Sequence, residues 1–133
     1  RRELYRQNYV YIHMPKVLVV DDTLFMRTAL SKMLQEWGFE VVAQAADGRE
    51  AVNMYKEHSP DLVTMDVTMP VMSGIEALKL IMQDDPEAKI IMITALGQQR
   101  IIVDALENGA KDFITKPFQP ENLKEVVFNV LEK

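Results

Sequence analysis

The stretch K-V-L-V-V-D-D (residues 16–22) decides the fold class of this chain. Its four consecutive apolar residues, Val17 to Val20, form a short run that does not alternate with polar residues. Such a run is typical of a strand covered on both faces, as in a parallel sheet between two layers of helices. Two acids follow directly, so the stretch predicts a buried strand with Asp21 and Asp22 at its carboxyl end.

The rest of the chain repeats this unit. Four more short apolar runs rich in β-branched residues occur at 41–43, 62–65, 90–93 and 113–115. Between the runs, apolar residues recur at helical spacing, as Leu30, Leu34 and Trp37 do before Gly38. The helices predicted in this way lie around 30–37, 51–55, 75–82, 101–106 and 123–131, with Ser73 as a candidate N-cap of the third. Five strands alternating with five helices predict a doubly wound parallel α/β sheet with helices on both faces.

The composition is that of a single globular domain. The 133 residues are 48% hydrophobic and 26% charged, and 15 Lys+Arg against 20 Asp+Glu give a net charge of −5. The absence of cysteine excludes a disulfide framework and a thiolate metal site or nucleophile. No apolar run approaches the roughly 20 residues needed to span a bilayer, and the acidic balance argues against a general nucleic-acid binder. We therefore expect no membrane contact and no direct nucleic-acid contact.

Residues 1–14 differ from the rest of the chain. Residues 1–13 contain three Arg and three Tyr, and they show neither a clear period nor the apolar core of a signal peptide. We expect 1–14 to be an N-terminal extension or a cloning remnant outside the domain, and 15–133 to form the domain itself. Because the predicted fifth helix reaches the last residues, we also expect no attached output domain.

Polar residues stand where the predicted strands end. Asp21 and Asp22 follow the first strand, Asp66 ends the third, Thr94 the fourth and Lys116 the fifth. The carboxyl ends of parallel strands meet at one edge of a sheet, so we expect these side chains to lie close together. Clustered carboxylates repel one another unless a cation neutralises them. Ligation by oxygen alone suits Mg²⁺, Mn²⁺ or Ca²⁺, so the sequence predicts a site for such an ion.

The same residues suit phosphoryl transfer. An aspartate can act as a nucleophile and form an aspartyl phosphate, while a lysine and a hydroxyl group can contact the phosphoryl oxygens. Each residue taken alone has an ordinary structural alternative. These alternatives are a helix N-cap for Asp21 or Asp22, a turn for Asp66, a strand end for Thr94 and a solvated surface position for Lys116. Their coincidence at one edge favours the functional interpretation.

Other phosphate chemistries lack their motifs in this chain. There is no G-x-x-x-x-G-K-[ST] loop of P-loop NTPases and no G-x-G-x-x-G after the first strand. Haloacid-dehalogenase phosphatases need a second acid two residues after the nucleophilic aspartate. Thr23 and Thr68 stand at those positions after Asp21 and Asp66. Both histidines lie away from the predicted edge, so a histidine-based site is not supported.

Four motifs resemble those of response-regulator receiver domains. They are V-L-V-V-D-D-T-L-F-M-R (17–27), D-L-V-T-M-D-V-T-M-P-V-M-S-G (61–74), I-I-M-I-T-A-L-G (90–97) and K-D-F-I-T-K-P-F (111–118). In order and spacing they are similar to the motifs of the CheY-like, single-domain receivers of chemotaxis, across residues 15–133. The resemblance implies a flavodoxin-like (βα)5 sheet with the strand order 2-1-3-4-5, which is the order of chemotaxis regulators of this type.

The resemblance implies a role for each residue of the predicted site. Asp66 would accept the phosphoryl group from a phosphohistidine of a sensor histidine kinase. Asp21, Asp22 and Asp66 would hold Mg²⁺, with the backbone carbonyl of Thr68 as a further ligand. Lys116 would contact a phosphoryl oxygen. A domain of this kind catalyses only its own phosphotransfer and autodephosphorylation, so we do not expect an enzyme that acts on other substrates.

A conformational switch is also implied. Thr94 would move toward the phosphoryl group, Phe113 would rotate inward into the space vacated, and the Lys116–Pro117 bond would be cis. Thr68 and Leu96 would flank the path of the hydrolysing water and so affect the phosphoryl lifetime. Because the apolar Leu96 offers that water no hydrogen bond, we expect phosphorylation to last at least as long as in relatives with an acid or amide at this position.

The implied output is contact with another protein. The face that changes in this family corresponds to 98–107, 111–115 and 120–131. The expected partners are a chemotaxis-type sensor kinase, a flagellar motor switch protein or other output protein, and a phosphatase, and we expect a cytoplasmic monomer. Two alternatives stay open: the receiver part of a longer DNA-binding response regulator, and a Mg²⁺-dependent phosphatase that turns over a small phosphoester through Asp66. The single tryptophan, Trp37, offers a fluorescent probe of the switch.

Overall fold

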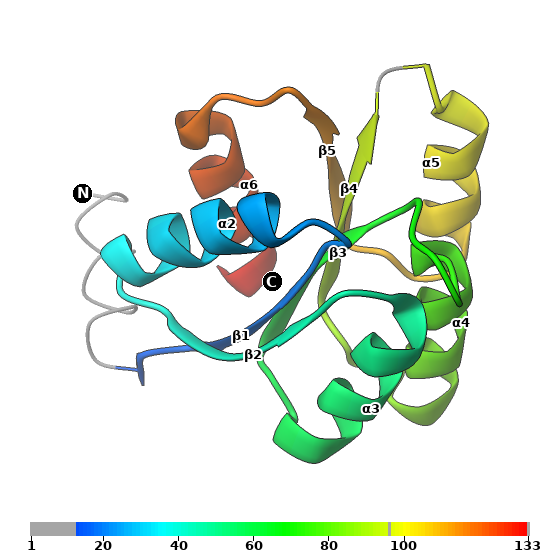
Figure 1. Cartoon of the computed structure of the whole chain (residues 1–133), viewed down its shortest axis with the longest axis horizontal. Helices are drawn as coiled ribbons and strands as arrows, with labels where there is room; N and C mark the ends of the chain where they lie inside the picture. Colours follow the sequence, from blue (N-terminus) through cyan, green and yellow to red (C-terminus); the bar gives the residue numbers. More distant parts are fainter. Residues whose placement is uncertain (1–12, 96, 133) are drawn as a thin grey trace.

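A computed structural model describes residues 13–95 and 97–132, and within these residues five strands form one parallel sheet. The strands are β1 (Lys16–Val20), β2 (Glu40–Ala45), β3 (Leu62–Asp66), β4 (Ile90–Ala95) and β5 (Asp112–Lys116). They pair in the order β2-β1-β3-β4-β5 (Figure 1). Both the parallel sheet and the predicted strand order are confirmed.

Helices cover both faces of the sheet. They are α2 (Leu24–Glu36), α3 (Gly48–His58), α4 (Gly74–Asp84), α5 (Gln99–Glu107) and α6 (Pro120–Glu132). Helices α2 and α6 lie on one face, and α3, α4 and α5 lie on the other (Figure 1). The fold is therefore the predicted flavodoxin-like, doubly wound α/β fold.

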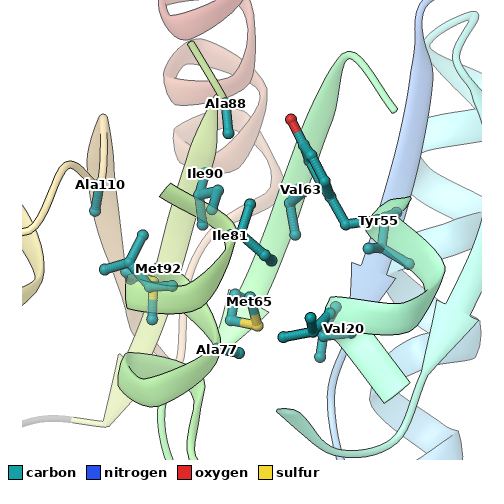
Figure 2. Packing of buried hydrophobic residues seen from close by; sticks show 14 of the residues in the cluster. Val20, Tyr55, Val63, Met65, Ala77, Ile81, Ala88, Ile90, Met92 and Ala110 are labelled. Atoms are coloured by element: carbon teal, nitrogen blue, oxygen red, sulfur yellow. The ribbon is translucent and has the colours of Figure 1, made fainter. Parts of the chain in front are cut away.

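Two hydrophobic clusters, one on each face, account for the continuous apolar runs. Val17 and Val19 of β1 belong to the cluster with α2 and α6, whereas Leu18 and Val20 belong to the cluster with α3, α4 and α5. Figure 2 shows part of the second cluster, where strand and helix side chains pack together. Successive residues of a strand point to opposite faces, so a strand with both faces buried is apolar at most of its positions and does not alternate with polar residues.

The helices are 9 to 13 residues long, and none in the described part of the chain is long and apolar enough to cross a membrane. The predicted Ser73 cap of α4 is confirmed, because its side chain accepts a hydrogen bond from the Glu76 backbone N–H. At the start of α2 the capping residue is Thr23. The alternative interpretation of Asp21 or Asp22 as a helix N-cap is therefore wrong.

The loop between β3 and α4 is held by two glycines. Gly48 N donates to Met72 O at 2.9 Å, and Gly74 N donates to Val67 O at 2.8 Å. A Cβ atom on Gly48 would meet the Met72 backbone carbonyl, and one on Gly74 would meet the Asp66 backbone carbonyl. Gly74 is the first residue of α4, and a glycine is needed there for this close backbone approach.

Candidate functional site

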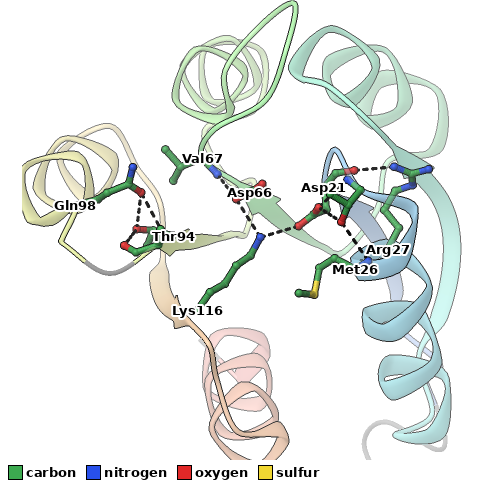
Figure 3. Close-up of polar contacts among 10 residues, drawn as sticks. Asp21, Met26, Arg27, Asp66, Val67, Thr94, Gln98 and Lys116 are labelled. Carbon is green, nitrogen blue, oxygen red and sulfur yellow. Dashed lines mark hydrogen bonds and ion pairs between the residues drawn. The ribbon is translucent and has the colours of Figure 1, made fainter.

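The carboxyl ends of four strands bring the predicted residues to one edge of the sheet. Asp21 and Asp22 follow β1, Asp66 ends β3, Thr94 lies in β4 and Lys116 ends β5. Figure 3 shows the Lys116 side chain reaching between Asp66 and Asp21, with Thr94 on the other side of Asp66. The coincidence expected from the strand ends is thus present in three dimensions.

Asp21 is held by contacts with both of its carboxylate oxygens. The residue is only 1% exposed. Its Oδ1 accepts hydrogen bonds from Thr23 N at 2.9 Å and from Thr23 Oγ1 at 3.0 Å, and its Oδ2 accepts one from Lys116 Nζ at 3.0 Å. Arg27 Nη1 also donates to the Asp21 backbone carbonyl at 2.9 Å. The position of this carboxylate is therefore fixed by both α2 and β5.

Three carboxylates at this edge can hold a metal ion. Asp21, Asp22 and Asp66 each offer an oxygen atom, and these oxygens lie within 4.8 Å of one another. Asp21 and Asp66 are buried, whereas Asp22 is exposed. Carboxylates at such separations repel one another unless a cation compensates their charge. The donor set contains oxygen alone, which fits a hard cation such as Mg²⁺, Mn²⁺ or Ca²⁺.

Among the acids that the structure describes, Asp66 is the one whose ionisation is most strongly opposed. The pKa of its carboxyl is raised from 3.8 to about 6; burial is the largest cause, and the charges of Asp21 and Asp22 act in the same direction. The Lys116 ammonium, 3.5 Å from Asp66 Oδ1, and the Val67 N–H, which donates to Oδ1 at 2.9 Å, act in the opposite direction. The residue is 8% exposed and is therefore not an ordinary turn aspartate.

Lys116 is a fixed positive charge and not a solvated surface lysine. Its side chain is 27% exposed, and its ammonium group contacts Asp21 Oδ2 at 3.0 Å and Asp66 Oδ1 at 3.5 Å. Burial lowers the pKa of this lysine, but the hydrogen bond that it donates to Asp21 and the charges of both acids outweigh burial and raise the pKa above its ordinary value. Lys116 is therefore charged at neutral pH and can compensate negative charge that develops beside Asp66.

Of the residues of the predicted switch, Thr94 lies at this edge, and Phe113 lies in β5 three residues before Lys116. Thr94 is fully buried, and Phe113 is half-buried against the cluster formed with α3, α4 and α5. The Lys116–Pro117 bond is cis, as the resemblance implies. Thr68 is exposed, two residues after Asp66. Leu96 lies outside the described residues, so its predicted position beside the path of water stays a prediction.

One family of known proteins matches most of the chain. The family described as the response regulator receiver domain matches residues 17–128, a range that contains all five residues at the carboxyl edge. The chain belongs to this receiver family. The resemblance of the four sequence motifs is thereby confirmed.

Individual relatives show which type of receiver this chain resembles. The chemotaxis protein CheY of Bacillus subtilis (strain 168) is 55% identical over 116 residues, which cover 87% of this chain and 97% of that protein. The chemotaxis protein CheY of Thermotoga maritima is 53% identical over 115 residues, or 86% of this chain and 96% of that protein. The crystal structure of the CheX–CheY–BeF3–Mg²⁺ complex from Borrelia burgdorferi contains a chain with a TM-score of 0.85 and 43% identity, covering 89% of this chain and 90% of that one. This receiver is a CheY-type response regulator, which is a signalling protein.

Sequence reasoning missed three residues that hold the site of the receiver in place. Thr23 and Arg27 fix Asp21 from α2, and Gln98 accepts a hydrogen bond from Thr94. Thr23 lacks a Glu or Gln three residues later, so the capping-box pattern that would have marked it is absent. Gln98 is not a preferred N-cap residue. No periodic pattern in the sequence marks Arg27 or Gln98 as a residue of the site.

In the metal-free receiver we expect Asp66 to titrate near pH 6. Burial disfavours the ionised carboxylate, so the midpoint should lie near 6 and not near the ordinary 3.8. NMR of the Asp66 carboxyl carbon in the presence of a chelator measures this midpoint. Adding Mg²⁺ should move it to lower pH, because a bound cation favours the carboxylate. A midpoint at or below about 4 in the metal-free protein would contradict the strong desolvation of this group.

Proposed function

We propose that this receiver is a phosphorylation-activated switch in chemotaxis. Asp66 accepts a phosphoryl group from a phosphohistidine of a sensor histidine kinase. Mg²⁺ is held by Asp21, Asp22 and Asp66, with the backbone carbonyl of Thr68. The observation that carries this proposal is the buried Asp66 carboxyl, which belongs to an acid cluster able to hold a metal ion and lies 3.5 Å from the Lys116 ammonium. The names of the relatives from B. subtilis and T. maritima support chemotaxis.

The transfer step uses groups that are already in place. A carboxylate oxygen of Asp66 attacks phosphorus, the P–N bond to the imidazole breaks, and the departing imidazole nitrogen takes up a proton. Lys116 is 3.5 Å from Asp66 Oδ1 and compensates negative charge on the phosphoryl oxygens. A bound Mg²⁺ would supply further compensation for the acids and the phosphoryl oxygens. Thr94, on the side of Asp66 opposite Asp21, supplies a hydroxyl donor once it turns toward the phosphoryl group (Figure 3).

An apolar surface beside the site suits a protein as the phosphoryl donor. A hollow of about 400 Å³ adjoins Lys116 and is lined mainly by apolar side chains of α2 and of the segment after β5. Phe25 lines this hollow and is 80% exposed. Exposed apolar patches are typical of protein interaction sites. Docking of a kinase domain here would place its phosphohistidine near Asp66, whereas a small phosphoester has no use for such a surface.

We expect Phe25→Ala to slow phosphotransfer from a sensor kinase without slowing phosphorylation by acetyl phosphate. Truncating an exposed aromatic residue within a protein interface removes contact area that only a protein donor uses, so the loss should be roughly tenfold. Single-turnover transfer from the phosphorylated kinase domain, followed beside acetyl phosphate labelling, measures both rates. Leu80→Ala, an exposed apolar residue on α4, is the matched control and should leave both rates unchanged. Equal slowing with both donors in Phe25→Ala would mean that the site itself is disturbed.

The domain boundary is part of the proposal. Residues 15–133 form the receiver domain, and residues 1–14 lie outside it as an extension. Pro15 is buried, and its carbonyl accepts a hydrogen bond from Glu40 N at 2.9 Å, which supports a start at this residue. The receiver acts as a monomer in the cytoplasm.

The output face consists of α5, β5 and α6. Phe113 on β5 is half-buried, so an inward rotation would change the surface that a partner meets. When phosphorylated, this face binds a flagellar motor switch protein or another output protein, and a phosphatase ends the signal. The CheY of Borrelia burgdorferi, which forms a complex with CheX, supports a second protein partner besides the output target.

Beryllofluoride with Mg²⁺ tests the proposal, because it imitates an aspartyl phosphate without covalent transfer. We expect backbone amide signals around Asp66 and across α5 and β5 to shift when both are added, and no shift with fluoride alone. Trp37 is a poorer reporter of the switch than expected from the sequence. It caps the far end of α2, a helix of 13 residues and thus about 20 Å long, whose other end lies at the site. Absence of amide shifts in α5 and β5 would refute the switch.

A further inference from the structure

The hydroxyl group of Thr94 is engaged by groups that lie away from Asp66. Thr94 is fully buried, and its Oγ1 is 2.9 Å from the Ala95 carbonyl oxygen and 3.1 Å from Gln98 Oε1 (Figure 3). Both partners are acceptors, so the single hydroxyl proton is shared between them. Thr94 must leave both partners before it can donate to a phosphoryl oxygen on Asp66.

A third contact identifies the Gln98 atom that faces Thr94. The backbone N–H of Ala95 donates to Gln98 Oε1 at 3.2 Å. A backbone N–H needs an acceptor, so the oxygen of the amide group and not its nitrogen must lie here. The Gln98 side chain therefore accepts hydrogen bonds from the last two residues of β4.

Gln98 is also part of the start of α5. It occupies the N-cap position, but its side chain makes no capping hydrogen bond there. Its backbone carbonyl accepts hydrogen bonds from Ile101 N and Ile102 N, each at 3.1 Å. One residue thus holds Thr94 with its side chain and the first turn of α5 with its backbone. It connects the Thr94 hydroxyl directly to a helix of the proposed output face.

We propose that Gln98 is a positioning residue that keeps Thr94 in its resting conformation, and that phosphorylation breaks this contact and releases the start of α5. The inference rests on the proposed function, because it requires a phosphoryl group on Asp66. Hydrogen bonds to a charged oxygen are roughly twice as strong as those between neutral groups, so the phosphoryl group draws the Thr94 hydroxyl away from Gln98. The contact therefore stabilises the resting state and weakens, without preventing, activation.

Gln98→Met tests this role, because methionine is similar in size and has no oxygen acceptor. We expect beryllofluoride with Mg²⁺ to bind about three- to tenfold more tightly, as loss of one neutral hydrogen bond from the resting state requires. The amide signals of α5 without beryllofluoride should also move part of the way toward their bound positions in the wild type. Gln99→Met, at the adjacent exposed glutamine, is the matched control and should behave as the wild type. Gln98→Glu keeps an acceptor oxygen and should retain the resting amide signals.

A double variant shows whether Gln98 acts through Thr94. In a Thr94→Val background the hydroxyl is absent, so adding Gln98→Met removes only the contact with the exposed Ala95 N–H and should change the beryllofluoride affinity and the amide signals of α5 much less than Gln98→Met does alone. An undiminished effect of Gln98→Met in that background would overturn the proposal. So would a Gln98→Met protein with the affinity and resting signals of the wild type. If the wild type itself shows no amide shifts with beryllofluoride and Mg²⁺, the proposed function fails, and this outcome is distinct from failure of the Gln98 role.

Discussion

Asp66→Asn is expected to abolish phosphorylation of this chain. With Mg²⁺ and acetyl phosphate, the wild type should take up one phosphoryl group per chain and the variant none, as measured by intact mass. An amide cannot replace the carboxylate as a nucleophile. The neighbouring acids offer no substitute: both oxygens of Asp21 are engaged by Thr23 and Lys116, and the exposed Asp22 carboxylate lacks a contact with the lysine ammonium. The loss should therefore be complete.

The loss is not expected to come from unfolding, because the same variant should be more stable than the wild type at neutral pH. The pKa of Asp66 is about 6 in the folded chain, so its ionisation costs on the order of 3 kcal/mol above that pH relative to the unfolded chain. Because the pKa of Asp66 is raised in the folded chain, this cost is absent below about pH 4, where the carboxyl is protonated in both states. The cost is complete above about pH 6, where the carboxyl is ionised in both states. The amide avoids the cost. The difference in the free energy of unfolding between variant and wild type should thus grow from pH 4 to pH 7 in urea titrations.

The control for Asp66→Asn is Asp84→Asn, at an exposed aspartate of α4. It should retain full phosphoryl uptake and a free energy of unfolding within about 0.5 kcal/mol of the wild type. Uptake that persists in Asp66→Asn would show that another residue is the acceptor. Multiple-turnover release of phosphate from a small phosphoester would favour the phosphatase alternative over the switch.

The fold could be predicted because two-sided burial leaves a strong signal in the sequence. The strands β1, β3 and β4 are almost entirely buried and appear as short, largely apolar runs. The edge strand β2 is partly exposed, so the run 41–43 indicates only half of its six residues. The start of α2 could not be found from its apolar stripe. Leu24 and Phe25 are apolar but 67% and 80% exposed, so they do not follow the face that packs on the sheet.

The site could be predicted as a set of residues but not as a set of contacts. Topology alone places the ends of β1, β3, β4 and β5 at one edge. The hydrogen-bond partner of each side chain depends on distances that differ by less than an ångström. Lys116 lies 3.0 Å from Asp21 and 3.5 Å from Asp66, and the Thr94 hydroxyl bonds to Gln98. Such choices are set by rotamers and loop geometry, which leave no spacing pattern in the chain.

Gly74→Ala is expected to destabilise the folded chain by about 3 kcal/mol, because the added methyl group overlaps backbone atoms that cannot move aside. The new Cβ would meet the Asp66 carbonyl oxygen and would lie 3.0 Å from its carbon atom. The Gly74 N–H also donates to Val67 O at 2.8 Å, so a shift of α4 away from β3 would weaken this hydrogen bond. Urea unfolding followed by circular dichroism measures the loss.

Gly97→Ala separates this steric effect from the general cost of replacing a glycine. Gly97 has φ +85°, and a Cβ there would have no neighbour within 4 Å. Its replacement should cost only the strain of a left-handed backbone, about 1 kcal/mol. Where Gly74→Ala remains folded, phosphoryl uptake from acetyl phosphate should be slower than in Gly97→Ala, because the methyl group displaces the backbone of the acceptor residue itself. Equal stability of the two variants would mean that the β3–α4 junction relaxes freely, and the position of Asp66 would then not depend on glycine at this residue.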